Sequence, residues 1–307
     1  METIFLVGPT AVGKSAVALE LAERLGAEIV SADSMQVYRG LDIGTAKPTS
    51  EERARVRHHL IDVCEVDEPF DVKRFVELAR AAIASCKRAL VVGGTGMYIR
   101  ALRQGLFEGP SRDAALRARL EAMSAAELFA ELQRVDPQTA ARIDRRNPRR
   151  LVRALEVFYT TGKPILQWQT QWENKRGSDA APAFGLLRER ADLVARIERR
   201  VEAQMAAGWL EEAGRLLARF PARCSVTGMT QHWTALQAAG YRELIAHLRG
   251  ELTLPEAVTL IKTRTRQLAR RQMTWFRREP GLRWIPVAAD EPPRKTAERI
   301  WEELTRR

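Results

Sequence analysis

Residues 8–15, Gly-Pro-Thr-Ala-Val-Gly-Lys-Ser, form a complete G-x-x-x-x-G-K-S/T pattern. Glycines let a backbone wrap around a phosphate so that successive N–H groups point at its oxygens. Lys14 would bring a positive charge to the terminal phosphate, and the Ser15 hydroxyl would be a ligand for Mg²⁺. The pattern therefore predicts a site for a diphosphate or triphosphate tail, and it leaves open what is attached to that tail.

A carboxylate, Asp33, follows the second apolar run of the chain, residues 28–32. At the end of a strand it could hold Mg²⁺ through water or act as a base, although Asp is also a common turn and N-cap residue. A later apolar run continues into Gly93-Gly94-Thr95, where an ATPase would carry an aspartate. This difference argues against routine ATP hydrolysis and leaves a nucleotide kinase possible in principle.

The elements that must position these residues alternate along the first hundred positions. Short apolar runs at residues 4–7, 28–32, 60–63 and 89–92 are separated by the helix-forming stretches 16–25 and 72–86. This alternation predicts a parallel sheet with helices on both faces. Ligands of such sheets bind at the carboxyl ends of the strands, where Asp33 and Thr95 would lie beside the phosphate loop.

The pattern changes at about residue 111, because strand signals stop until residues 183–187. Helical stretches at 114–123, 126–135 and 149–159 lie between them. We therefore predict an α/β protein with a P-loop-type parallel sheet core, a helical insertion domain and a helical C-terminal part. Residues 1–110 and 183–307 would form the core, and residues 111–182 the insertion.

The charge balance points to a polyanionic partner. The 307 residues contain 50 Lys and Arg against 39 Asp and Glu, a net charge of +11. Two stretches concentrate this excess: Arg142, Arg145, Arg146, Arg149, Arg150 and Arg153 in the first, and Lys262, Arg264, Arg266, Arg270, Arg271, Arg277 and Arg278 in the second. One such run is ordinarily a solvated face, but two together favour contact with an RNA backbone.

Several classes of protein are excluded. No run approaches the ~18 apolar residues of a membrane-spanning helix, so we expect no membrane partner. The N-terminus has no basic segment before an apolar one, so we expect no secretory leader. The 3 cysteines are far apart and without a C-x-x-C pair, which argues against a disulfide framework or a cysteine-based zinc site and fits a reducing cytoplasm.

Several segments follow one another in a recognisable order: residues 8–15, 31–48, 58–62, 93–98, 150–157, 161–164, 196–201, 237–243 and 265–276. In these segments the chain resembles the tRNA dimethylallyltransferases, also called tRNA isopentenyltransferases. The resemblance covers roughly residues 3–285 and departs from the family pattern at Arg57, Ala239 and Arg270. Residues 221–235 are longer than the family usually has there, and we place no functional residue among them.

The resemblance implies transfer of a dimethylallyl group from dimethylallyl diphosphate to N6 of adenine 37 of tRNA, just 3′ of the anticodon, with release of diphosphate. It implies Mg²⁺ as cofactor, the anticodon stem-loop as partner of the insertion, and a monomeric cytoplasmic enzyme. Asp33 would be the general base, with Thr95 and Arg200 as further catalytic residues. The diphosphate would bind Gly8, Pro9, Thr10, Ala11, Val12, Gly13, Lys14 and Ser15. The expected tRNA contacts are Asp33, Ser34, Met35, Gln36, Thr95, Arg117, Arg149, Arg150, Leu151, Val152, Arg153, Gln237, Gly240, Tyr241, Arg242, Arg270, Arg271, Gln272, Trp275 and Arg277.

Three alternatives share parts of this pattern. A P-loop nucleotide or small-molecule kinase explains the phosphate loop but neither the insertion nor the arginine clusters. An RNA-binding GTPase-like switch would need an N-K-x-D motif, which the sequence lacks. An adenylate isopentenyltransferase, which prenylates free AMP or ATP, would have no use for the insertion.

Overall fold

The computed structural model describes residues 2–105, 109–110, 113–169, 181–221 and 234–306. A six-stranded sheet with the order β3-β2-β4-β1-β5-β6 forms its centre, and every pairing in it is parallel. Its strands are β1 (Glu2–Val7), β2 (Glu28–Ser31), β3 (His58–His59), β4 (Arg88–Gly93), β5 (Ala183–Leu187) and β6 (Arg283–Pro286). The predicted α/β class with a parallel sheet is confirmed.

The third strand lies earlier in the sequence than predicted. We expected it at residues 60–63, whereas β3 consists of His58 and His59. Leu60 and Asp62 have left-handed φ angles of 63° and 57°, which interrupt an extended strand. The apolar pattern marked a buried segment correctly and did not reveal this turn.

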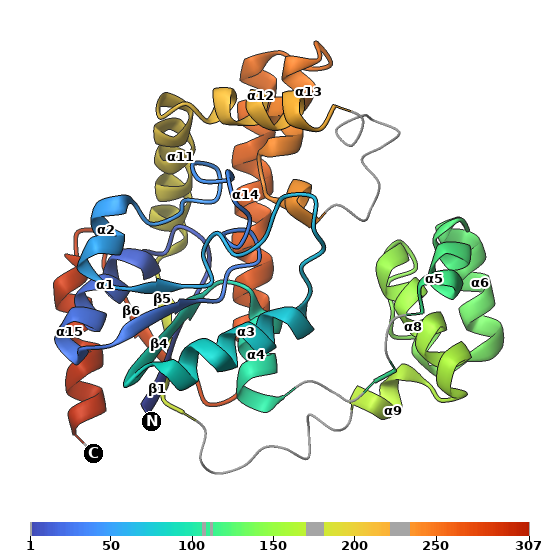
Figure 1. The fold of residues 1–307 in the computed structure, drawn as a ribbon, viewed down its shortest axis with the longest axis horizontal. Coiled ribbons are helices and arrows are strands. Elements are labelled where there is room, and N and C mark those ends of the chain that lie inside the picture. The colour runs from blue at the N-terminus through green and yellow to red at the C-terminus, as the bar shows by residue number, and fades with distance from the viewer. Residues whose placement is uncertain (1, 106–108, 111–112, 170–180, 222–233, 307) are drawn as a thin grey trace. The chain divides into compact units, whose positions relative to one another are not determined.

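Helices cover both faces of the sheet (Figure 1). Ile4 and Leu6 of β1 pack in one cluster with α1 (Lys14–Leu25) and α15 (Pro293–Thr305). Phe5 alternates to the other face, where Arg103 of α4 (Gly96–Gln104) lies over its ring. There α3 (Val72–Ser85) meets α4 through the stacked rings of Phe75 and Tyr98, 3.9 Å apart.

The remaining helices of the core are α2 (Ser50–Arg55), α11 (Arg190–Ala206), α12 (Trp209–Arg219), a 3-10 turn (Thr234–Gln237), α13 (Tyr241–Leu248) and α14 (Leu254–Phe276). Of these, α2 lies near α1, and α11, α12, α13 and α14 lie together (Figure 1). A capping box between Thr253 and Glu256 begins α14, whose buried positions include Ala257, Ile261 and Phe276. This long helix reaches from α13 to the phosphate loop, where Gln272 near its carboxyl end accepts a hydrogen bond from the N–H of Thr10.

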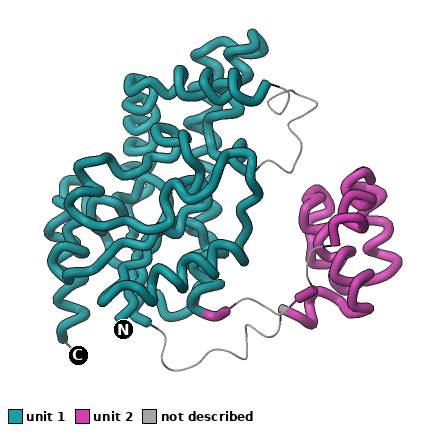
Figure 2. The backbone as a smooth tube through the Cα atoms, viewed as in Figure 1, with its two compact units in different colours: residues 1–103, 180–307 teal, residues 104–179 magenta. Residues whose placement is uncertain are grey.

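The chain divides into two compact units, Met1–Arg103 with Ala180–Arg307, and Gln104–Asp179 (Figure 2). The second unit contains α5 (Ala114–Glu121), α6 (Ala125–Val135), α7 (Pro137–Ala140), α8 (Pro148–Thr161) and α9 (Ile165–Gln169). Leu128 and Leu132 of α6 pack with Leu151 and Leu155 of α8 in a core of its own. The helical insertion was predicted at residues 111–182, whereas this unit spans residues 104–179. Residues 111, 112 and 170–180 of the predicted range lie outside the described residues, so its bounds stay a prediction.

Candidate active site

The phosphate loop joins β1 to α1 and depends on two glycines. Gly8 and Gly13 have φ angles of 151° and 106°, and Ala11 between them is left-handed at 64°. A Cβ at Gly8 would lie 3.1 Å from the carbonyl oxygen of Leu186 on the neighbouring strand. Because Gly13 forms the N-cap of α1, the amino end of that helix faces the loop.

Three arginines that follow β5 in the sequence donate hydrogen bonds to the phosphate loop. Arg188 Nε donates to the carbonyl of Val12 at 2.8 Å, and Arg196 Nε donates to that of Ala11 at 2.9 Å. Arg200 Nη2 donates to Thr10 Oγ1 at 2.8 Å. The sequence motifs predicted a role for Arg200 but not for the other two. The i,i+4 spacing of Arg196 and Arg200 on α11 was a signal for the shared face.

The positive charges at the loop are partly withdrawn from water. Burial lowers the pKa of Lys14 to about 8, an effect that Asp33 opposes and Arg200 reinforces. Burial also lowers the pKa of Arg200, again against the attraction of Asp33. Lys14 Nζ donates to the carbonyl of Pro9 at 2.8 Å. These two cations and one carboxylate therefore influence each other within one site.

Asp33 and Thr95 meet where β2 and β4 end side by side. The backbone N–H groups of Met35 and Gln36 donate to Asp33 Oδ1 at 2.8 and 3.4 Å. The N–H of Ser34 donates to Thr95 Oγ1 at 3.1 Å. The two strands approach so closely at Gly93 that a Cβ there would overlap the carbonyl of Ala32. The predicted adjacency of Asp33 and Thr95 is thus seen in the structure.

A cavity of about 410 Å³ lies between the loop and the strand ends. It brings together many of the expected residues, namely Thr10, Ala11, Gly13, Lys14, Ser15, Asp33, Gln36 and Arg200. The cavity is also lined by Thr45, Ala46, Lys47 and Pro48, for which the sequence motifs predicted no role. The cavity has both a phosphate loop and a carboxylate on its wall.

Two residues that were predicted to contact tRNA, Gln272 and Trp275, pack against the segments that form the site. Gln272 of α14 accepts from the N–H of Thr10 at 2.8 Å and donates to the carbonyl of Gly94 at 2.9 Å. The Trp275 ring packs so closely against Gly96 that a Cβ at that position would overlap the ring. The Arg100 guanidinium lies 4.6 Å from the centre of the same ring. Gln272 therefore links the phosphate loop to the end of β4.

The residues of the segment 237–242 differ in how far they are exposed to solvent. Gln237 is exposed and Arg242 is half-buried. Tyr241 is 0% exposed, and its hydroxyl donates to Glu212 at 2.5 Å. Gly240 packs against the ring of Trp209 at a φ of 105°, where a side chain would overlap that ring.

In the helical unit, the expected residues divide between surface and interior. Arg149 and Arg150 are exposed, whereas Leu151 and Val152 are 0% and 2% exposed in the unit's own core. Arg117 and Arg153 are half-buried, and each pairs with the fully buried Glu156, at 3.4 and 2.8 Å. Elsewhere, Arg270, Arg271 and Arg277 are exposed, Ser34 and Met35 are half-buried, and residues 222–233 lie outside the described part of the chain.

Comparison with known proteins assigns the chain to a family. Residues 36–279 match the model of the family described as IPP transferase. The chain is 46% identical to tRNA dimethylallyltransferase 1 of Trichlorobacter lovleyi over 92% of both chains. It is also 46% identical to the tRNA dimethylallyltransferase of Anaeromyxobacter dehalogenans over 98% of this chain and 99% of that one. The protein belongs to the tRNA dimethylallyltransferase family.

Solved structures of the family share the fold. The tRNA isopentenylpyrophosphate transferase of Bacillus halodurans matches with a TM-score of 0.69 and 35% identity, covering 99% of this chain and 97% of that one. A eukaryotic dimethylallyltransferase matches with a TM-score of 0.81 over 100% of this chain and 80% of that one, and at 23% identity it supports the fold alone. Across the described residues, no helix has both the length and the apolar character needed to span a membrane.

Proposed function

We propose that this tRNA dimethylallyltransferase moves the dimethylallyl group of dimethylallyl diphosphate to N6 of adenine 37 of tRNA and releases diphosphate. The observation that carries the proposal is that one cavity is lined by both the phosphate loop and Asp33. A prenyl diphosphate needs a site for its leaving group, and an aromatic amine needs an acceptor for its proton. This cavity provides both a site for the leaving diphosphate and an acceptor for the amine proton.

The phosphate loop would bind the diphosphate. Negative charge grows on this group as the C1–O bond breaks, and preformed donors stabilise such charge most effectively where water is excluded. Lys14, Arg200 and the amide groups at the start of α1 are suitable donors at this wall of the cavity. Arg188 and Arg196 donate to two carbonyls of the loop, which satisfies these acceptors and holds the loop in place for the ligand.

The residues also fit a Mg²⁺ ion. Ser15 is exposed at the first turn of α1 and lines the cavity, so its hydroxyl would be one ligand, with diphosphate oxygens and water as the others. When bound, the ion would screen charge on the leaving diphosphate. Ser15 would hold the ion, while Lys14 and Arg200 contact the same diphosphate directly.

Asp33 would act as the general base. The N6 lone pair attacks C1, the C1–O bond breaks with its electron pair going to diphosphate, and the N6 proton passes to Asp33. Two amide hydrogen bonds to Oδ1 fix the carboxylate, and within the described part of the chain no hydrogen bond is made to Oδ2. Oδ2 is therefore the oxygen that we assign to the proton, with Thr95 beside Asp33 to contact the adenine.

The exposed basic residues would bind the anticodon stem-loop. A base in an RNA loop must leave its stack before an enzyme can modify it, and contacts to the phosphate backbone favour that state. The exposed arginines of the helical unit include Arg145, Arg146, Arg149 and Arg150, and α14 adds Arg270 and Arg271. We place the proposed reaction in the cytoplasm, where tRNA is found. A single copy of the chain contains every residue that the proposed reaction uses, so we propose a monomer.

One assay distinguishes the proposal from the alternatives. The protein is incubated with labelled dimethylallyl diphosphate and Mg²⁺, first with unmodified tRNA, then with AMP, and finally with ATP and no prenyl donor. Label on tRNA alone, recovered as N6-dimethylallyladenosine, supports the proposal. Label on AMP would indicate an adenylate isopentenyltransferase, and phosphoryl transfer from ATP without prenylation would indicate a kinase.

A further inference from the structure

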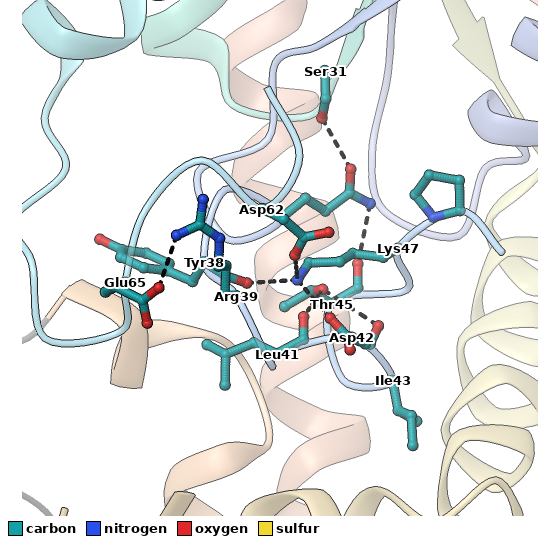
Figure 3. A network of polar contacts seen from close by, with 12 residues as sticks. Ser31, Tyr38, Arg39, Leu41, Asp42, Ile43, Thr45, Lys47, Asp62 and Glu65 are labelled. Atoms are coloured by element: carbon teal, nitrogen blue, oxygen red, sulfur yellow. Dashed lines mark hydrogen bonds and ion pairs between the residues drawn. The ribbon is translucent and has the colours of Figure 1, made fainter. Parts of the chain in front are cut away.

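Residues 41–48, the pocket loop, include four residues that line the cavity, 45–48, and Lys47 is the most deeply buried charged side chain of the loop. Although lysines are usually solvated, the Lys47 side chain is only 2% exposed. Its Nζ donates to the carbonyl of Tyr38 at 2.5 Å, to Asp42 Oδ1 at 2.6 Å and to Asp62 Oδ1 at 2.6 Å (Figure 3). All three protons of the ammonium group are thus used within the protein.

The charges around Lys47 are balanced. Asp62 also accepts from Arg53 at 2.9 Å, so two carboxylates face two cations. Burial alone would raise the pKa of Asp62, but hydrogen bonds from Lys47 and Arg53 hold it below its ordinary value. Lys47 therefore differs from Lys14, whose ammonium group donates to a backbone carbonyl rather than to a carboxylate. We assign to Lys47 no direct contact with the diphosphate.

The backbone around Lys47 is strained. Ala46 and Asp62 have left-handed φ angles of 51° and 57°, although neither is a glycine. Such a conformation is unfavourable for a residue with a side chain and persists only where its surroundings hold it. Lys47 contacts Asp62 directly and follows Ala46, so its ion pairs hold both turns.

A chain of hydrogen bonds connects the pocket loop to Asp33. Gln36 Nε2 donates to the carbonyls of Thr45 and Ala46 at 3.3 and 3.0 Å, and Gln36 Oε1 accepts from Ser31 Oγ at 2.9 Å. The backbone N–H of the same Gln36 donates to Asp33 Oδ1. The position of residues 45 and 46 therefore affects Gln36, one of the two residues whose amides fix the Asp33 carboxylate.

The other end of the pocket loop is held separately. Glu212 of α12, 3% exposed, accepts from three successive N–H groups, those of Asp42, Ile43 and Gly44, at 2.9, 2.9 and 3.1 Å. A change at Lys47 would thus leave the first half of the loop attached to α12. Its effect would be concentrated in the half that faces the cavity.

We propose that Lys47 is a positioning residue for catalysis: it holds residues 45–48 against Gln36 and thereby aims the Asp33 carboxylate at the reacting amine. The inference rests on the function proposed above. It predicts a loss in turnover with little loss in donor affinity, because the Lys47 ammonium group is paired with Asp42 and Asp62 and is assigned no contact with the diphosphate. Misplacing a catalytic group by about 1 Å can cost about 10²-fold in rate.

The test compares Lys47→Met with Arg39→Gln under saturating tRNA. Arg39 pairs with Glu65 at 2.8 Å in the same region but is exposed and does not line the cavity, so its variant controls for the loss of an ion pair. We expect kcat of Lys47→Met to fall about 10- to 100-fold and the KM for dimethylallyl diphosphate to stay within about twofold. Arg39→Gln should keep both. Asp62→Asn, a milder change at the same ion pair, should lower kcat by a smaller factor and serves if Lys47→Met does not fold.

A double-mutant cycle with Gln36→Ala tests the route. If Lys47 acts through Gln36, Lys47→Met should lower kcat far less in the Gln36→Ala background than in the native one. Equal factors in both backgrounds, an unchanged kcat, or a raised KM with native kcat would each overturn the inference. Native protein that fails to prenylate tRNA would contradict the proposed function instead, so the two failures are distinguishable.

Discussion

The arginines of the cavity and those of the helical unit differ in how they are held. Arg188, Arg196 and Arg200 are hydrogen-bonded to the phosphate loop, and the Arg188 side chain is 5% exposed. Arg145 and Arg150 are exposed on the second unit. A fixed guanidinium can stabilise charge at one point without reorganising, whereas a solvated one follows an extended polyanion. The same residue type thus suits a leaving group in one unit and an RNA backbone in the other.

The largest expected effect concerns the carboxylate that faces the cavity cations. Asp33→Asn keeps the oxygen that accepts from Met35 and Gln36 but cannot take a proton, and Asp33→Ala loses both features. We expect both variants to lose about 10²–10⁴ in kcat, while a fluorescence or calorimetric titration shows donor binding retained. Native turnover in Asp33→Asn would exclude this carboxylate as the general base.

Next comes the cavity arginine itself. Arg200→Met removes a donor to Thr10 and to the proposed diphosphate, so kcat/KM for dimethylallyl diphosphate should fall by about 10²-fold. Arg199→Met is the matched control, because Arg199 is the preceding residue of the same helix and is exposed. Equal losses in the two variants would show that the cavity position has no special importance.

A smaller effect should follow from pH. The pKa of Lys14 is lowered to about 8, so the cation predominates at pH 7 and disappears as the pH rises through 8. Donor binding needs the cation, and the KM for dimethylallyl diphosphate should therefore rise by up to about tenfold between pH 7 and pH 9. Lys14→Arg stays charged in this range, so the rise should be absent from that variant. A native KM that is flat across this range would contradict the assignment.

The smallest effect is expected for the solvated arginines. Arg145→Ala with Arg150→Ala should weaken tRNA binding modestly and reduce the slope of log affinity against log salt by about one for each phosphate that is no longer neutralised. Donor KM should not change. Arg153→Ala serves as a contrast, because it leaves the buried Glu156 with one partner fewer and should lower the melting temperature of the unit. An unchanged salt slope in the double variant would place the RNA elsewhere.

The features of the fold and site that could be predicted from the sequence are those that depend on short local patterns. The phosphate loop, the strands before and after it, and the meeting of Asp33 with Thr95 all follow from short motifs and from the rule for parallel sheets. On α14 the apolar residues Ile261, Leu268 and Trp275 recur every seven positions, and this spacing predicts only some of the buried residues of the helix. The buried positions include Thr265 and Ala269, because 3.6 residues per turn shifts a seven-residue repeat around the helix.

What could not be predicted depends on contacts between distant parts of the chain. Gln272 reaches Thr10 across 262 positions, and Arg188 reaches Val12 across 176. No spacing in the sequence indicates either hydrogen bond. The same holds for Lys47, whose neighbours predict a turn but not a buried ion pair with Asp62. Motif resemblance likewise marked Leu151 and Val152 without showing that their side chains are interior.

The most direct test of the central claim is a crystal structure with dimethylallyl thiodiphosphate, a slowly reacting analogue of the donor. We predict its diphosphate within hydrogen-bond distance of Lys14, Arg200 and the N–H groups at residues 13–15, with C1 directed toward Asp33. A diphosphate bound outside the Gly8–Ser15 loop, or a prenyl chain whose C1 is directed away from Asp33, would contradict it.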